Sequence, residues 1–248
     1  MRFFGLTDKG ISRAENQDSF DIREIPSKKC TVCVLCDGMG GQNSGNYASE
    51  LARRSFLDFV VARLTSRTNK SPDPCQVLVN GALEANSVVF QYSQFTEEYN
   101  GMGSTLVGGI VYDNGKVFIV NVGDSRAYLI SPKSGTVRQI TKDHSLVEMW
   151  VSAGIITREE ARKNRNRNII TRSIGAEGTV ESDTFEEYLK NNEMLLLCSD
   201  GVSNYLTDED LLSLAKEYSE PDGLCLRIKE VVYSRGAGDN LTAVAVVK

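Results

Sequence analysis

Four aspartates stand beside glycine at the ends of apolar segments, an arrangement that suits the binding of hard metal ions. A strand end holds a side chain more rigidly than a loop tip, and a neighbouring glycine lets a backbone carbonyl approach an ion closely. Carboxylate and carbonyl oxygens are the ligands that Mg²⁺ and Mn²⁺ prefer. The four residues are Asp37 before Gly38, Asp124 after Gly123, Asp200 before Gly201, and Asp239 after Gly238.

These aspartates have two interpretations. An Asp-Gly pair most often forms a turn, and a turn is a sufficient account of any one of them. Several carboxylates in a single site instead need cations to neutralise them. One aspartate that bridges two metal ions would set them about 4 Å apart, the spacing that activates water for attack on phosphorus. The recurrence of the pattern at four positions favours the metal site.

The polar loop near the N-terminus supplies the positive charge that an anionic substrate needs. Arg13 precedes Asp18 by five residues in this loop. A guanidinium group can bind a phosphate through two parallel hydrogen bonds. Taken alone, Arg13 is more typical of a surface salt bridge, so a role in phosphate binding depends on the metal site.

Composition excludes several classes of protein. The chain has 248 residues, a net charge of −5 and a single histidine, His144. One histidine cannot build a multi-histidine zinc site, and an acidic chain is a poor nucleic-acid binder. The sequence has no long apolar run and no secretory leader, and its six cysteines do not form a disulfide framework. We therefore expect one cytoplasmic domain over residues 1–248, acting as a monomer without a membrane or nucleic-acid partner.

The spacing of apolar residues predicts an α+β fold in which strands come in runs and helices in pairs. The segment Asp113-Asn114-Gly115 is a strong hairpin turn signal, and a break is predicted at 69–74. The predicted strands are 1–6, 19–25, 30–36, 105–112, 116–122, 125–131, 136–140, 182–188, 193–198 and 241–247, and the predicted helices are 43–64, 75–99, 145–154, 157–163, 207–218 and 221–234.

Three cysteines, Cys30, Cys33 and Cys36, have a spacing that metal clusters also use. Strand alternation places Cys33 on the opposite face from the other two. No fourth ligand follows at a suitable spacing. We therefore interpret all three as core residues.

Several short blocks of sequence occur in an order that is specific in combination. The blocks are Arg13 with Asn16-Gln17-Asp18, Asp37-Gly38-Met39-Gly40-Gly41, Gly103-Ser104-Thr105, Gly123-Asp124-Ser125-Arg126, Thr141-Lys142-Asp143-His144-Ser145, Cys198-Ser199-Asp200-Gly201 and Gly238-Asp239-Asn240-Leu241-Thr242. With these blocks the chain closely resembles the metal-dependent (type 2C, PPM) protein serine/threonine phosphatases. The glycine-rich block with Met39 resembles that of their compact bacterial branch. The resemblance runs from residue 5 to residue 247.

The resemblance implies a four-layer αββα sandwich, with two antiparallel sheets flanked by helix pairs. It also implies that Asp37 bridges two Mg²⁺ or Mn²⁺ ions. The Gly38 carbonyl would bind one of these ions, and Asp200 and Asp239 would bind the other. Asp124, together with Asp200, would hold a third and weaker ion.

The implied activity is hydrolysis of phosphoserine and phosphothreonine in proteins by attack of a metal-bridging water, without a phosphoenzyme. Arg13 would bind the substrate phosphate, and Asp18 would organise metal-bound water. The substrates would be phosphorylated proteins, made by a serine/threonine kinase. A phosphoprotein-binding pseudophosphatase and a metal-dependent phosphohydrolase of small molecules stay open as alternatives. The presence of all the predicted acids argues against the pseudophosphatase.

Two residues depart from the pattern that eukaryotic relatives often show. Gln17 stands where they carry glutamate, so it adds no negative charge to the site. Met39 stands where they carry histidine, and a thioether has no proton to give to the leaving group. Leaving-group protonation would then come from metal-bound water or another group. His144 lies beside the predicted flap, and we expect a structural role for it.

A flap segment is predicted at about 145–172, and its second half is basic. Residues 158–172 carry six basic and two acidic side chains, a local charge of +4. A solvated helix and loop would account for this charge. The resemblance instead implies a mobile flap that recognises protein substrates. In that case, reversing the charges of Arg165 and Arg167 alters phosphoprotein turnover and spares p-nitrophenyl phosphate.

Overall fold

The structure is a computed structural model, and it describes residues 1–40, 44–66, 72–95 and 97–248. The predicted helix start at residue 43 and the block residue Gly41 lie outside these ranges. Residues 69–71, the first half of the predicted break at 69–74, also lie outside them.

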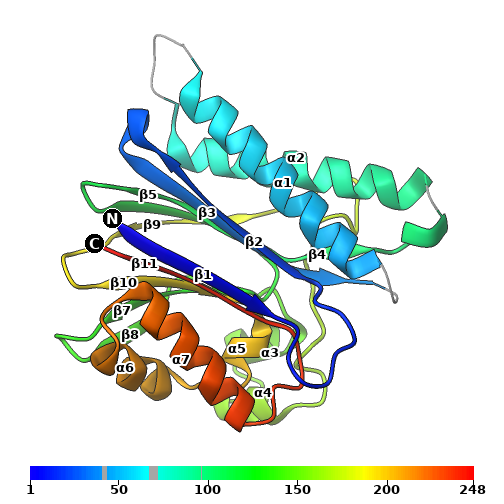
Figure 1. The fold of residues 1–248 in the computed structure, drawn as a ribbon. Coiled ribbons are helices and arrows are strands. Elements are labelled where there is room, and N and C mark those ends of the chain that lie inside the picture. Colours follow the sequence, from blue (N-terminus) through cyan, green and yellow to red (C-terminus); the bar gives the residue numbers. More distant parts are fainter. Residues whose placement is uncertain (41–43, 67–71, 96) are drawn as a thin grey trace.

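Two antiparallel sheets form the centre of the molecule, and the two ends of the chain lie side by side in one of them (Figure 1). The first sheet has the strand order β1 (Arg2–Asp8), β11 (Leu241–Val247), β10 (Met194–Cys198), β7 (Arg126–Ser131) and β8 (Thr136–Gln139). The second has the order β2 (Asp18–Ile25), β3 (Cys30–Met39), β5 (Leu106–Tyr112), β6 (Lys116–Val122) and β9 (Asp183–Tyr188), and the short β4 (Gly103–Ser104) pairs with the end of β3.

A pair of helices covers the outer face of each sheet (Figure 1). Helices α1 (Ser44–Thr65) and α2 (Pro74–Phe95) pack on the second sheet, while α6 (Asp208–Glu217) and α7 (Pro221–Ser234) pack on the first. Local sequence sets where the latter two begin. Thr207 and Asp210 form a capping box at the start of α6, and Pro221 stands in the first turn of α7. The predicted αββα sandwich is confirmed.

Three apolar clusters hold these layers together, one between the sheets and one under each helix pair. The strand β3 contributes to two of them because its side chains alternate between its faces. Cys33 lies between the sheets, whereas Cys30 and Cys36 face α1 and α2. The predicted alternation is therefore confirmed. Burial raises the pKa of the Cys33 thiol to about 12, so this cysteine is a core residue without nucleophilic character.

Two element boundaries were predicted wrongly by several residues, and one short helix was missed. The strand predicted to end at Cys36 continues to Met39, because β4 extends the ladder by pairing with Gly38 and Met39. Asp37 is thus a residue within a strand and does not follow one. The second long helix ends at Phe95, and a separate 3₁₀ turn covers Glu97–Tyr99. A short helix, α5 (Asp200–Ser203), begins at Asp200 and was not predicted.

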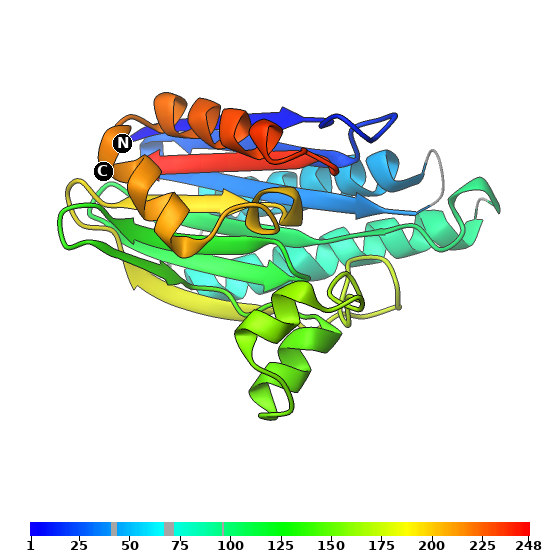
Figure 2. The same cartoon turned by 90° about the horizontal axis from the view of Figure 1, so that it is seen from below.

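The segment predicted as a flap stands away from the sandwich (Figure 2). It carries α3 (Leu146–Ser152) and α4 (Arg158–Lys163), which confirms both predicted helices. Thr157 and Glu160 form a capping box at the start of α4. An isolated bridge between Ser145 and Ile170 closes the base of the segment.

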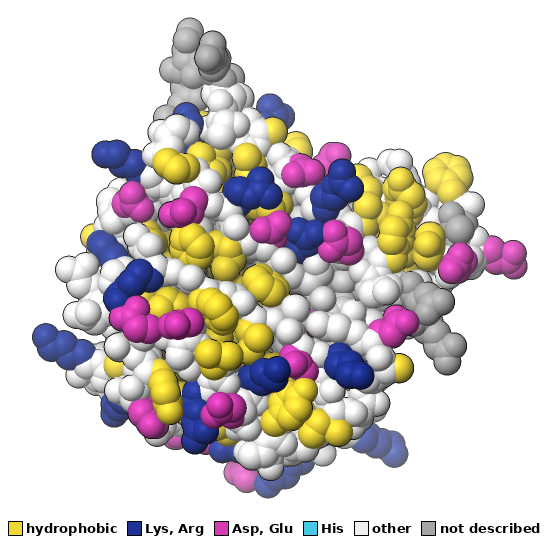
Figure 3. Space-filling model, viewed as in Figure 1, with side chains coloured by type: hydrophobic (Ala, Val, Ile, Leu, Met, Phe, Trp, Pro, Cys, Tyr) yellow, Lys and Arg dark blue, Asp and Glu magenta, His cyan; other side chains and the backbone are white. Residues whose placement is uncertain are grey.

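None of the helices in the described part of the chain is long and apolar enough to cross a membrane. On the face shown in Figure 3, acidic and basic side chains are interspersed.

Candidate metal centre

Asp18 and Asp37 face each other across neighbouring strands. They are register partners at the end of the β2–β3 ladder. Paired positions on adjacent antiparallel strands bring their side chains within about 5.5 Å of each other. Two carboxylates this close repel each other unless a proton or a cation lies between them.

The backbone of Asp37 is held from three directions by hydroxyl-bearing residues. Its N–H donates to Thr105 Oγ1 at 2.9 Å, and its carbonyl accepts from Thr105 N–H at 2.8 Å and from Ser104 Oγ at 3.0 Å. Thr105 Oγ1 in turn shares a hydrogen bond of 2.7 Å with Ser125 Oγ, next to Asp124. These bonds fix two acid-bearing segments against each other.

The Asp18 side chain is buried and only half satisfied. Its Oδ2 accepts hydrogen bonds from Ser199 Oγ and from Thr242 Oγ1, each at 2.7 Å. Its Oδ1 is buried, and no partner for it exists among the described residues. Ser199 directly precedes Asp200, so Asp18 is bonded to the segment that carries another of the predicted ligands. A buried oxygen without a donor is a position that a cation or a water would fill.

Asp239, which the sequence predicts as a metal ligand, is paired with Arg13, which the sequence predicts to bind the substrate phosphate. Arg13 Nε lies 2.8 Å from Asp239 Oδ1, and its second guanidinium nitrogen donates to Oδ2 at 2.8 Å. About half of the Arg13 side chain is exposed. Asp200, at the start of α5, accepts a hydrogen bond from Asn204.

Glycines beside the acids allow backbone segments to approach more closely than any side chain would permit. A Cβ atom on Gly38 would lie 1.9 Å from the carbonyl oxygen of Gly45, and one on Gly201 would lie 1.8 Å from that of Asn240. Both positions therefore require glycine. The packing brings the start of α1 to the end of β3 and the turn after Asp239 to the start of α5.

Strand pairing and hydrogen bonds bring the acid-bearing segments together, and the acids raise each other's pKa. Burial is the largest cause of every shift: it raises the pKa of Asp200 to about 6, that of Asp18 to about 7 and that of Asp124 to about 8. Burial also raises the pKa of Asp37 well above its ordinary value. The negative charges that add to this effect at Asp37 belong to Asp18, Asp200, Asp124 and Asp239.

The donor set fits divalent metal ions. The predicted ligands are hard oxygens, the nearby Asp18 Oδ1 lacks a partner among the described residues, and the carboxylates repel each other in the absence of cations. In the described part of the chain, however, no three His, Cys, Asp or Glu side chains are already gathered as a ligand cluster. Arg13 contacts both oxygens of the Asp239 carboxylate. A metal ion at Asp239 would compete with this guanidinium for the carboxylate.

We expect the stability of the metal-free protein to fall as the pH rises from about 5 to about 8.5. Asp200, Asp18 and Asp124 have folded-state pKa values of about 6, 7 and 8, above the ordinary value of 3.8. A carboxyl group with a raised pKa favours folding while it is protonated, and this contribution is lost as the pH passes through the folded-state value. Urea unfolding at several pH values measures the effect.

Saturating Mn²⁺ serves as the control, because the cations replace the lost protons and should flatten the dependence. Asp210, whose pKa Arg235 lowers to about 2, acts only below about pH 4 and does not interfere in this range. A metal-free protein that becomes more stable between pH 5 and 8.5 would contradict the convergence of buried acids.

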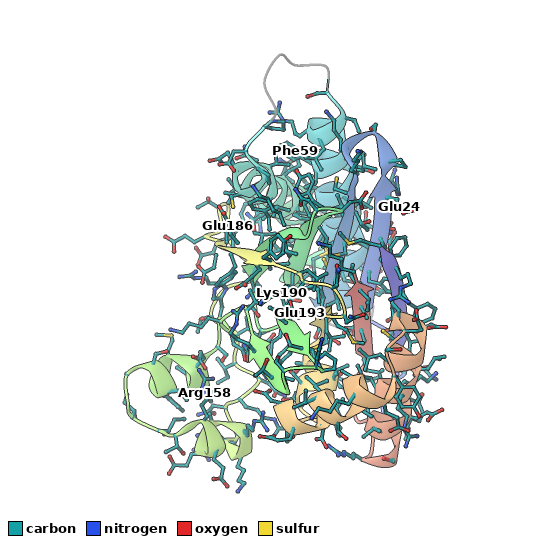
Figure 4. The ribbon with its side chains drawn as sticks, turned by 90° about the vertical axis from the view of Figure 1, so that its left-hand side faces the viewer. Glu24, Phe59, Arg158, Glu186, Lys190 and Glu193 are labelled. Carbon is teal, nitrogen blue, oxygen red and sulfur yellow. The ribbon has the colours of Figure 1, made fainter. Side chains whose placement is uncertain are left out.

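A groove of about 690 Å³ leads from the acids to the flap. Asp124 and Asp200 line one part of it, and residues of α3 and α4 line another. Arg158, labelled on α4 in Figure 4, forms an ion pair at 3.2 Å with Glu148 on α3, and this pair ties the two flap helices together. The basic side chains in the groove wall are Arg126, Arg138, Lys142, Arg158, Arg162 and Arg167.

His144 is buried, and its contacts support the structural role that we expect from the sequence. Its ring Nδ1 accepts a hydrogen bond from the Gly123 N–H at 3.1 Å, and its backbone N–H donates to the Gly123 carbonyl at 2.9 Å. Its Nε2 lies 3.2 Å from Asp183 Oδ2. The histidine thus clamps the turn before Asp124 to the base of the flap.

The sequence analysis placed the charged residues but missed the neutral ones that position them. The missed positions share a hydroxyl or a carboxamide that bonds an acid or an acid-bearing loop. The signal was present, since all of them fall inside the blocks that carry the family resemblance: Ser104, Thr105, Ser125, Ser199, Asn240 and Thr242.

Comparisons with known proteins identify the family. The sequence pattern described as protein phosphatase 2C matches residues 11–222. The serine/threonine phosphatase stp of Listeria welshimeri is 35% identical over 246 residues, 97% of this chain and 93% of that protein. The structure of serine/threonine phosphatase Stp1 from Staphylococcus aureus is similar with a TM-score of 0.89, at 32% identity over 99% of this chain and 94% of that one. A structure of the catalytic domain of the serine threonine protein phosphatase PstP in complex with two manganese ions is similar with a TM-score of 0.82, at 30% identity over 100% and 98% of the two chains.

The fold, the converging acids and these similarities together define the class: the chain belongs to the protein phosphatase 2C family. It is a metal-dependent protein serine/threonine phosphatase, and its substrates are phosphorylated proteins. The family resemblance, the fold and the enzyme class that the sequence predicts are all confirmed.

Proposed function

We propose that this phosphatase works with two Mn²⁺ or Mg²⁺ ions bound by Asp37, Asp200, Asp239 and the Gly38 carbonyl, and with a third ion at Asp124 and Asp200. The convergence of buried carboxyl groups is the observation that carries the proposal, since their charges repel until cations enter. When bound, the ions supply charge neutralisation and activate water for direct attack on phosphorus.

The chain's own residues then bind the substrate and orient the water. Arg13 leaves Asp239 and binds the peripheral oxygens of the phosphate through its fork of N–H donors. Asp18 keeps Oδ2 on Ser199 and Thr242 and presents the unpartnered Oδ1 to water. Met39, on the last position of β3, holds no proton for the leaving group.

Metal-stripped protein is expected to be inactive on a phosphothreonine peptide and to recover hydrolysis when Mn²⁺ or Mg²⁺ is added. The metals supply most of the charge neutralisation that phosphate monoester hydrolysis demands, so the recovery should exceed about 10³-fold. Phosphate release against ion concentration measures it, with equilibrium dialysis to count the bound ions.

The same assay separates the alternatives. Asp124→Asn is the matched variant for the third ion, and it should lower the number of weakly bound ions while two tight ones remain. Peptide binding without hydrolysis under all metal conditions would favour a pseudophosphatase. Faster hydrolysis of nucleotides than of phosphopeptides would favour a small-molecule phosphohydrolase.

We further propose that the segment 145–172 is a flap that recognises the protein part of the substrate. The groove that joins it to the acids is lined by cationic side chains from the flap, among them Arg162 and Arg167. A peptide bound at the metal centre would extend along this groove. Arg165 is also exposed, but it is not among the described residues that line the groove.

Charge reversal at Arg167 is expected to change kcat/KM for a phosphopeptide by roughly 10-fold, because it removes one cation from the groove and adds an anion. Turnover of p-nitrophenyl phosphate, which has no polypeptide to contact the groove, should stay the same. Steady-state kinetics on both substrates tests this expectation. Arg165→Glu is the matched control, with the same change in charge outside the groove.

Equal effects of the two reversals would indicate a general electrostatic influence and would contradict a recognition role for the groove. Equal effects of Arg167→Glu on both substrates would place this side chain at the phosphate itself.

The cellular context that fits these features is the cytoplasm, where the enzyme would act as a monomer and reverse a serine/threonine kinase. All six cysteines are free, which suits a reducing compartment. The net charge of −5 disfavours nucleic acid as a partner.

A further inference from the structure

We propose that Asn240 is a positioning residue that holds the Arg13 loop, residues 9–17, in its phosphate-binding place. This inference rests on the role proposed above for Arg13. Asn240 itself is buried at 5% exposure and follows the predicted metal ligand Asp239 directly. A single side chain at this point can therefore join the phosphate-binding loop to the metal centre.

The Asn240 carboxamide forms hydrogen bonds with both ends of the loop. Its Nδ2 donates to the Lys9 carbonyl at 3.0 Å and to the Glu15 carbonyl at 2.8 Å. Its Oδ1 accepts from the Gln17 N–H at 2.9 Å. Arg13 lies between these anchoring points, so the carboxamide closes the loop around it.

The backbone of Asn240 connects the same residue to two metal ligands. Its N–H donates to Asp239 Oδ1 at 2.8 Å. Its carbonyl packs against Gly201, where a Cβ atom would approach to 1.8 Å, and Gly201 follows Asp200. These backbone contacts fix the Asn240 side chain relative to the acids, and the side chain in turn fixes the position of the loop.

Other contacts also hold the loop, but each of them involves only one of its ends. The Ile11 N–H donates to the Ala237 carbonyl at 2.8 Å, and Asn16 Nδ2 donates to Thr7 Oγ1 at 2.8 Å. Asn240→Ala would leave these contacts in place while the carbonyls of Lys9 and Glu15 lose their donor. Partial release of the loop, with the protein still folded, is the expected consequence.

We expect Asn240→Ala to lower kcat/KM for a phosphothreonine peptide by about 10- to 100-fold, because the Lys9 and Glu15 carbonyls lose their donor and Arg13 loses its fixed place. Inhibition by inorganic phosphate should weaken in parallel. Mn²⁺ affinity, measured by calorimetry, should change by no more than about threefold, since the metal ligands themselves remain. A general loss of structure would weaken both phosphate inhibition and Mn²⁺ binding, so a loss of the first alone distinguishes the positioning role.

A double-mutant cycle with Arg13→Ala provides the decisive readout. If Asn240 acts through Arg13, then Arg13→Ala/Asn240→Ala should have a kcat/KM within about threefold of Arg13→Ala alone. Should Asn240→Ala fail to fold, Asn240→Asp keeps the side-chain shape and the acceptor for Gln17 but lacks the donor, and it replaces Asn240→Ala in the cycle.

Asn86→Ala is the matched control. Asn86 is equally buried, and its carboxamide also bonds a loop, donating to the Glu177 carbonyl at 3.0 Å and accepting from the Gly175 N–H at 2.8 Å. It should lower the unfolding midpoint comparably while inhibition by phosphate persists. Additive losses in the cycle, with Arg13→Ala impaired, would overturn this inference alone. Wild-type kcat/KM in Arg13→Ala would overturn the proposed role of Arg13 and the inference with it.

Discussion

Asp37→Asn is expected to lower kcat for a phosphothreonine peptide by at least about 10³-fold while the protein stays folded. Asp37 is the most central of the acids, since the charges of the four other acids all act on it. The amide keeps the shape of the side chain but removes the charge that would bridge two cations. Steady-state hydrolysis and metal binding by calorimetry measure the two consequences together.

The metal-free Asp37→Asn protein should also be more stable than the wild type near pH 8. Burial and neighbouring negative charges oppose ionisation of Asp37, so a neutral side chain relieves that repulsion. Asp21→Asn is the matched control, because Asp21 lies on the same strand as Asp18 but pairs with Arg53 at 2.7 Å. Activity above about one tenth of the wild-type value in Asp37→Asn would remove it from the metal centre.

Arg13→Ala is expected to lower kcat/KM by roughly 10- to 100-fold, the value of a charged hydrogen-bonding pair to the phosphate. At the same time, Mn²⁺ should bind the variant at least as tightly as the wild type, since Asp239 no longer has a guanidinium on both of its oxygens. Kinetics and calorimetry on one preparation separate the two effects.

Arg13→Lys is an informative companion to this variant. Lysine keeps the charge but lacks the planar fork, so it should restore only part of the loss. Arg235→Ala removes another arginine that binds an aspartate through two nitrogens, in this case Asp210 on α6, and serves as the control. Weaker Mn²⁺ binding in Arg13→Ala would contradict the competition between the guanidinium and the metal.

Most of the architecture follows from patterns that are local in the chain. The turn Asp113-Asn114-Gly115 joins β5 and β6 as predicted, with Gly115 at a φ of 101°, which glycine adopts without strain. The helix α7 begins and ends at the predicted residues. Caps, turn residues and apolar periodicity act over a few residues, so the sequence displays them directly.

The wrong end predicted for β3 arose where a distant segment decided the outcome. Strand β3 extends past Cys36 because Gly103 and Ser104, far along the chain, add ladder pairs to its end. The local apolar pattern does not explain why α2 ends at Phe95, before the predicted end. No local pattern could report the pairing of β4 with β3.

By itself, the sequence determined which side chains can do chemistry in this protein and the order in which the strands and helices bring them. Only the tertiary structure decided how they are arranged: that Asp18 faces Asp37 across a ladder, and that Arg13 rests on Asp239. It also decided that a neutral residue, Asn240, holds the loop that carries Arg13. The physical reason is that residue type sets charge and hydrogen-bonding capacity, whereas contacts between residues more than 200 positions apart exist only after the sheets have assembled.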